Sequence, residues 1–187
     1  KYLGVIIRDD CSTLTDISSR LGKARAGFQT LHKFWRHTDI SIAYKLKIYK
    51  AIFIPMITYG MESAAITQAQ FNRLNAFHSQ CVRKIYNIKS TYFTEILDPT
   101  YTTTTNMEAL QLAHINSLQA LIQRQRLKFL GHVYRCQPSE LEREVVFTGV
   151  FVYRARAAKQ RRGRPKGHWV EQVSQLAWQN VQDINHL

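Results

Sequence analysis

Three small groups of residues have types and spacings that suit metal binding. Asp9 and Asp10 follow a predicted strand, where adjacent carboxylates can hold magnesium ions. Two pairs have helical spacings at which side chains can share a zinc ion: His78 with Cys81, and His132 with Cys136. We interpret the aspartates as a turn and the pairs as packing residues, because separate helices would have to converge to complete a zinc site. The sequence therefore predicts no metal site, no cofactor and no catalytic residue.

Basic residues form a stronger pattern than these candidate ligands. Helical spacing puts four residues on one side of a predicted helix: Arg124, Lys128, His132 and Arg135. Apolar residues fall mostly on another side, which can dock: Ile122, Phe129, Leu130 and Val133. Seven basic residues follow without a carboxylate among them: Arg154, Arg156, Lys159, Arg161, Arg162, Arg164 and Lys166. Three lysines lie off the apolar stripe of an earlier helix: Lys45, Lys47 and Lys50. We predict that all of these basic residues bind nucleic-acid phosphates.

The charge of the chain indicates the same kind of partner. The 187 residues have a formal net charge of +13. Residues 1–90 contain fourteen Lys and Arg against five Asp and Glu, and residues 121–170 contain twelve against three. Such clusters favour a polyanion, because its condensed counterions are released on binding. We expect shape to matter more than base sequence and favour RNA over DNA. A solvated charged surface is the alternative.

Two further patterns allow other modes of nucleic-acid binding. RGRP at residues 162–165 has the Arg-Gly-Arg core of a hook that enters the DNA minor groove. We favour a basic strap across phosphates instead, because Trp169 and an amphipathic helix follow. Tyr44, Tyr134 and Trp169 are candidates for stacking on unpaired bases, although aromatic residues at helical spacing usually belong to the core.

Hydrophobic periodicity predicts a mainly α protein with small β additions. Residues 2–7 read as a short N-terminal strand, and residues 145–153 as a small β-hairpin. An apolar stripe at intervals of four and three predicts a helix of about five turns: Ile17, Leu21, Ala24, Phe28, Leu31 and Trp35. A second helix follows Asp39 or Ser41, and Pro55 should kink or end it.

A capping box at Thr67 and Gln70 opens a third predicted helix. Its inner face would contain six residues: Phe71, Leu74, His78, Cys81, Val82 and Ile85. Residues 98–106 read as a loop and residues 110–134 as a further helix. Ser139 with Glu142 should cap a short helical turn, and Pro165 suits the start of the last helix.

These elements group into two predicted lobes. Residues 1–90 form the first lobe, residues 91–107 a connector, and residues 108–187 a basic C-terminal lobe. Cys11, Cys81 and Cys136 are scattered and form no CxxC, which favours reduced thiols and an intracellular setting. The most apolar stretch, residues 51–57, is too short to span a bilayer, so no membrane partner is predicted.

Four motifs, in their order and approximate spacing, carry a resemblance to a known family. They are KYLGVII at residues 1–7, KLKIYKAIFIPMITYGMES at residues 45–63, RLKFLGHVYR at residues 126–135, and RRGRPKGHW at residues 161–169. Together they resemble the C-terminal part of the reverse transcriptases of non-LTR, LINE-type retrotransposons. The first is similar to the strand that closes the palm, the second to the thumb, and the last two to the C-terminal extension.

The resemblance implies a helical, thumb-like bundle that grips nucleic acid without performing chemistry. In that family the metal-binding carboxylates of polymerisation lie in the palm, N-terminal to the segment that this chain resembles. Asp9 and Asp10 would therefore lie downstream of the active site. We expect a non-enzymatic domain that binds structured RNA, such as ribosomal RNA, beside other proteins of a ribonucleoprotein.

Two other functions stay open from the sequence. The chain could be the thumb segment of an active reverse transcriptase that holds an RNA–DNA duplex, or a protein-interaction scaffold whose basic surface is only solubilising. We favour recruitment into a ribonucleoprotein, for example an organellar ribosome, because the polymerase chemistry is missing while the basic residues are present. Mitochondrial and nuclear locations both fit an intracellular protein of this kind.

Overall fold

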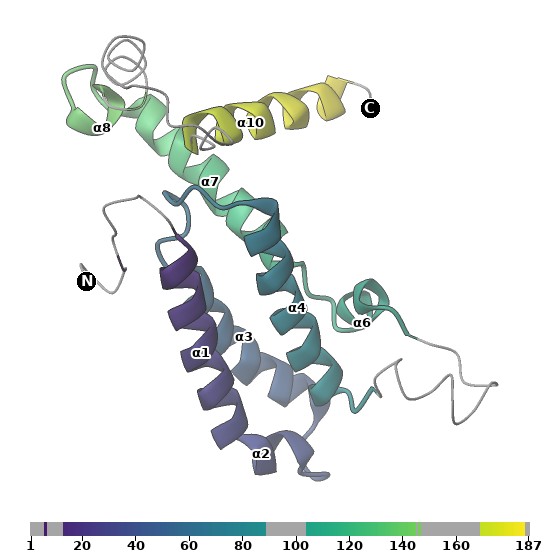
Figure 1. The fold of residues 1–187 in the computed structure, drawn as a ribbon. Coiled ribbons are helices and arrows are strands. Elements are labelled where there is room, and N and C mark those ends of the chain that lie inside the picture. Colours follow the sequence, from purple (N-terminus) through teal and green to yellow (C-terminus); the bar gives the residue numbers. More distant parts are fainter. Residues whose placement is uncertain (1–5, 7–12, 89–103, 145, 147–168, 186–187) are drawn as a thin grey trace. The chain divides into compact units, whose positions relative to one another are not determined.

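The fold of the described residues is helical. A computed structural model describes residues 6, 13–88, 104–144, 146 and 169–185. These residues form eight helices and no strand, which confirms the prediction of a mainly α protein (Figure 1). Apart from Ile6 and Val146, the predicted strand and hairpin lie outside the described residues. None of the described helices is long and apolar enough to cross a membrane.

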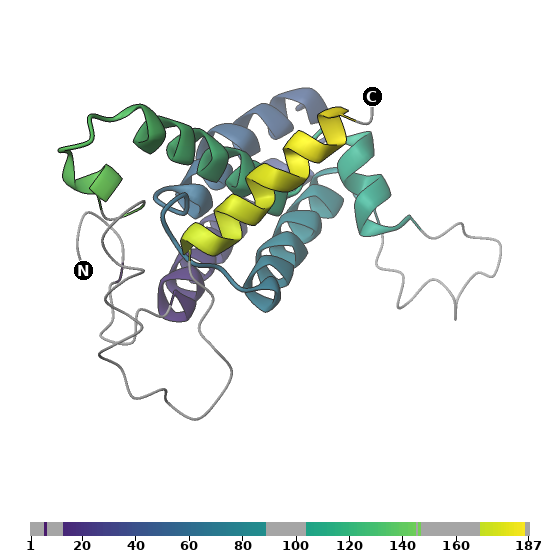
Figure 2. The same cartoon turned by 90° about the horizontal axis from the view of Figure 1, so that it is seen from above.

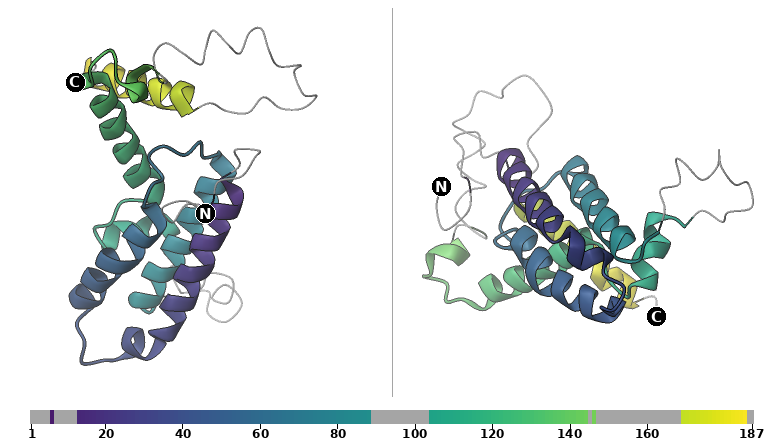
Figure 3. Two further views of the ribbon diagram at one scale, coloured as in Figure 1. Left: turned by 90° about the vertical axis from the view of Figure 1, so that its left-hand side faces the viewer. Right: turned by 90° about the horizontal axis from the view of Figure 1, so that it is seen from below.

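The chain divides into two compact units. The first comprises residues 1–60 and 66–121, and the second comprises residues 61–65 and 122–187. The division at residues 121 and 122 lies beyond the predicted connector. Helices α1 to α6 belong to the first unit, whose α1, α3 and α4 form a three-helix bundle, seen from the side and from below in Figure 3.

Helices α1 (Leu14–Thr30) and α2 (His32–Arg36) replace the single predicted helix. The predicted stripe is nevertheless the buried face of α1, and it continues to Trp35 in α2. The chain bends at Leu31, and the Trp35 indole then donates a 2.8 Å hydrogen bond to the Phe28 carbonyl. Because the rings of Phe28 and Trp35 also stack with centroids 4.6 Å apart, the bend keeps both side chains in one core.

Helix α3 (Ile42–Thr58) begins where the sequence predicts. The Ser41 hydroxyl caps it by accepting from the backbone N–H of Tyr44. Pro55 does not end the helix, which continues for three further residues. Proline removes one backbone donor from the helix, but burial of Phe53 and Ile57 on either side favours continuation.

Helix α4 (Gln68–Ile85) has the predicted start and the predicted inner face. Thr67 and Gln70 form a complete capping box, and all six residues of that face are buried. The helix ends at Ile85, and Asn87, which follows the C-cap residue, has a positive φ of 56°. The N–H of Ile88 then bonds the Arg83 carbonyl in a Schellman motif.

Helices α6 (Asn106–Leu112) and α7 (Leu118–Arg135) correct the prediction of one continuous helix from residue 110. His114 adopts a positive φ of 50°, and the Ile115 N–H bonds the Leu110 carbonyl. This second Schellman motif satisfies the last carbonyls of α6, so the chain turns before α7 begins.

The second unit contains most of α7, together with α8 (Leu141–Glu144) and α10 (Trp169–Asn185). Helices α7 and α10 pack against each other (Figure 2), and the Phe129 and Trp169 rings meet edge to face at 5.6 Å. Met61, Ile122, Val133 and Val173 are almost fully buried in this unit.

Candidate nucleic-acid interface

One face of α7 presents the predicted basic residues. All four are exposed: Arg124, Lys128, His132 and Arg135. The opposite face supplies Ile122 and Val133, both 0% exposed, whereas the other two residues of the predicted docking face, Phe129 and Leu130, are half-buried. At a rise of about 1.5 Å per residue, the four side chains extend over roughly 16 Å. We call these four residues the α7 stripe.

The α7 stripe has no acidic partner among the described residues. The ion pairs found there join Arg20 to Asp16, at 2.7 Å, and His37 to Asp39, at 3.8 Å. The cations of the stripe are therefore not neutralised by neighbouring carboxylates of the described chain. Within the part of the chain that the structure describes, no carboxylate competes with an external anion for these charges.

Arg126 lies on the same helix but serves the fold. Its side chain is 3% exposed, and its guanidinium donates to the Ala64 carbonyl and, at 3.5 Å, to the side-chain oxygen of Gln172. Burial lowers the pKa of Arg126 to about 10, which leaves it protonated at neutral pH. Arg126 thus joins residues 61–65, α7 and α10 inside the second unit.

Arg143 also has a structural role, at the end of α7. Its guanidinium donates to the carbonyls of Tyr134, at 2.9 Å, and Cys136, at 2.7 Å, and it lies 5.6 Å from the Tyr134 ring centroid. A cation at a helix C-terminus satisfies carbonyls that lack partners within the helix. Neither Arg126 nor Arg143 is among the predicted binding residues, and nothing local in the sequence marks either of them as structural.

The three predicted lysines of α3 divide into two kinds. Lys47 and Lys50 are exposed, as a phosphate contact requires. Lys45 is only 6% exposed, and its ammonium donates a 2.7 Å hydrogen bond to the His37 carbonyl. Lys45 thus fastens the start of α3 to the turn after α2, and we exclude it from the proposed interface.

The predicted basic strap lies outside the described residues. This holds for all seven of its members: Arg154, Arg156, Lys159, Arg161, Arg162, Arg164 and Lys166. The strap therefore stays a prediction from sequence.

The residues predicted to stack on unpaired bases differ in how much of each side chain is exposed to solvent. Tyr134 is 66% exposed and Tyr44 is 52% exposed. Trp169 is half-buried, and its indole N–H donates to the Glu62 carbonyl. Trp169 therefore helps to hold the second unit together, whereas the two tyrosines present ring surface to solvent.

His78 and Cys81 are buried in the core of the first unit, as their predicted packing role requires. His78 has hydrogen-bond partners on both ring nitrogens. The Tyr49 hydroxyl lies 2.7 Å from His78 Nδ1, and His78 Nε2 lies 3.2 Å from the Asn116 carbonyl. Burial lowers the pKa of His78 to about 4 and raises the pKa of Cys81 to about 12. Both side chains are therefore uncharged at neutral pH, and the Cys81 thiol is unsuited to nucleophilic attack.

Among the residues that the structure describes, no three histidine, cysteine or acidic side chains gather as a metal site would require.

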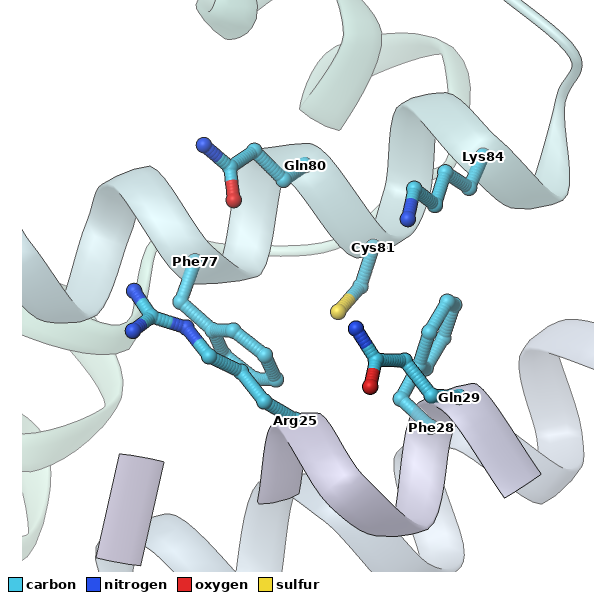
Figure 4. Close-up of a pocket in the computed structure, with 7 residues that line it drawn as sticks. All are labelled: Arg25, Phe28, Gln29, Phe77, Gln80, Cys81 and Lys84. Atoms are coloured by element: carbon cyan, nitrogen blue, oxygen red, sulfur yellow. The ribbon is translucent and has the colours of Figure 1, made fainter. Parts of the chain in front are cut away.

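A hollow of about 190 Å³ lies in the first unit, between α1 and α4 (Figure 4). Arg25 and Lys84 stand at its rim. Sequence reasoning did not select either residue, because their convergence depends on the packing of two helices that are distant in sequence.

Comparison with protein families, with curated proteins and with solved structures finds no match to this chain.

Proposed function

We propose that this chain is a non-catalytic, reverse-transcriptase-derived domain that holds structured RNA through phosphate contacts within a ribonucleoprotein. The α7 stripe carries the proposal, because its side chains are exposed on one helix face and have no acidic partner among the described residues. The net charge of +13 and the order of the four sequence motifs support it.

Helix geometry explains how the α7 stripe would bind RNA. Residues four apart on a helix are separated by about 6 Å along its axis, so successive side chains can reach successive phosphates. Arg124 can donate to two phosphate oxygens through its planar guanidinium, and Lys128 acts as a point charge. Such contacts read the path of the backbone rather than the bases, which favours recognition of RNA shape.

A salt series tests this proposal. In a mobility-shift assay with a stable RNA hairpin, the affinity should fall steeply as salt rises, because each phosphate contact releases counterions. A variant with Arg124→Ala, Lys128→Ala and Arg135→Ala should reduce the slope of log affinity against log salt by about 2 to 3. At 0.1 M salt its affinity should be about 100-fold lower.

A charge-matched variant serves as the control. Lys23, Lys33 and Arg36 are exposed in the first unit and lie outside the proposed interface. Replacing these three residues by alanine removes the same charge and should change the slope much less. Circular dichroism should show unchanged helicity in both variants. A wild-type chain that binds no RNA, or binds it without salt dependence, would instead be a protein-interaction scaffold.

The motifs similar to the palm strand and thumb favour a second candidate, a polymerase segment that holds template and primer. Competition between an RNA hairpin and an RNA–DNA duplex of equal length separates the two. We expect the RNA hairpin to compete at least as well. A clear preference for the hybrid would favour the polymerase segment, and RNA sequencing of the copurified native complex would identify the bound molecule.

A further inference from the structure

The hollow between α1 and α4 has an apolar floor. Phe28, Phe77 and Cys81 form this floor, and each is no more than 5% exposed (Figure 4). The ring of Phe28 also stacks on that of Trp35, with centroids 4.6 Å apart. The thiol of Cys81 is neutral, so the floor carries no charge. A surface of this kind suits the face of an aromatic ring.

The rim of the hollow is polar and positively charged. Arg25 and Gln29 come from α1, and Gln80 and Lys84 come from α4 (Figure 4). All four are exposed, and the Arg25 guanidinium lies 6.0 Å from the Phe77 ring centroid. Among the described residues, the side chains of Gln29, Gln80 and Lys84 have no hydrogen-bond partner. Each amide can both donate and accept, as the edge of a nucleobase does.

The size of the hollow narrows the choice of ligand. Its volume is about 190 Å³. An engineered cavity of about 150 Å³ in another protein holds benzene, so this hollow admits one planar ring but not a stack of rings. A base within a duplex cannot enter, because its faces are covered by its neighbours.

We infer that this hollow receives one unpaired nucleobase of a bound RNA, with Gln29 and Gln80 on the base edge and Arg25 and Lys84 on the flanking phosphates. The inference rests on the proposed RNA-binding function and adds to it a preference for a bulged or looped nucleotide. Stacking of a base on aromatic side chains contributes about tenfold or more to affinity. The α7 stripe supplies affinity for any backbone, whereas the hollow distinguishes an unpaired base.

Two hairpins that differ by one bulged adenosine test the inference. We expect wild-type protein to bind the bulged hairpin about tenfold more tightly than the fully paired one. The variant Gln29→Glu with Gln80→Glu replaces two amides that can donate to the base edge by carboxylates that can only accept, and it should reduce this ratio to about one. Its helicity should not change, because both residues are exposed.

A control variant carries the same charge change elsewhere. Gln111 and Gln179 are exposed and do not line the hollow. Gln111→Glu with Gln179→Glu should keep the tenfold ratio. If wild-type protein binds both hairpins equally, or if the rim variant keeps the ratio, the inference is overturned while the proposed function stands. If neither hairpin binds, the proposed function fails and the inference fails with it.

Discussion

Each unit of this chain buries one basic side chain whose pKa is lowered by burial. The first unit encloses His78, an imidazole whose pKa burial lowers to about 4, among aromatic side chains. The second unit encloses Arg126, whose pKa burial lowers to about 10. At neutral pH the first group is therefore uncharged and the second is charged. The same physical effect, desolvation, leads to opposite charge states because the two groups start from different pKa values.

This difference shows where each unit is vulnerable. A neutral imidazole with two hydrogen-bond partners fits a closed core at neutral pH, but it becomes unfavourable when a proton is added. The buried guanidinium of Arg126 keeps its charge over the physiological pH range. The stability of the second unit therefore depends on the hydrogen-bond acceptors around this group. The first unit should thus respond to acid, and the second to the loss of particular contacts.

The largest expected effect concerns Arg126. Arg126→Ala should lower the free energy of unfolding of the second unit by about 3 kcal/mol, because the Ala64 carbonyl loses a charged donor and a cavity remains. Hydrogen exchange should accelerate at amides of α7 and α10 and stay slow in α1 and α3. Arg124→Ala, which removes an exposed arginine from the same helix, should cost less than about 0.5 kcal/mol. Equal losses in the two variants would contradict a structural role for Arg126.

In the first unit, we expect the free energy of unfolding to fall by up to a similar amount as the pH is lowered. Between pH 6.5 and about 4, the unfolded chain binds a proton at residue 78 that the folded chain does not. The contribution of His78 to stability is therefore complete above pH 6.5, and up to about 3 kcal/mol is lost as the pH falls toward 4. Urea unfolding at several pH values measures this slope.

Two variants identify the source of the slope. His78→Gln should flatten the dependence between pH 6.5 and 4, whatever it does to stability at pH 7. His32→Gln, at an exposed position of α2, should leave the slope as it is in the wild type. A steep slope that persists in the His78 variant would assign the acid sensitivity to other groups.

The smallest expected effect is a gain in the stability of the first unit. His114 has a positive φ of 50°, a conformation that glycine adopts without steric cost. His114→Gly should raise the midpoint of thermal unfolding, with a gain of about 0.5 to 1 kcal/mol. His114→Ala keeps the Cβ atom and should give no such gain. If alanine stabilises as much as glycine, backbone strain is not the cause.

The sequence predicted local features of the fold well. The start of α4 followed from Thr67 and Gln70, because a capping box depends on residues only three apart. The exposed and buried faces of α7 followed from helical spacing alone. The break at His114 was missed, because histidine is not the residue that normally marks a left-handed helix end.

Features of the candidate site that depend on distant contacts were harder to predict. Lys45 has the same spacing pattern as Lys47 and Lys50, but the turn containing His37 binds its ammonium and removes it from the surface. Arg25 and Lys84 come together only when α1 packs on α4. No sequence pattern around either residue indicates that the other will lie nearby. Periodicity indicates which face of a helix is buried, but not which element covers it.

The five residues from Met61 to Ala65 belong to the second unit, although the chain on both sides of them belongs to the first. The Ala64 carbonyl accepts from Arg126, and the Glu62 carbonyl accepts from the Trp169 indole. A fragment cut to residues 122–187 would therefore lack two acceptors that its own side chains need. Simple truncation would therefore misjudge the C-terminal third of the chain, which needs residues 61–65 to be complete.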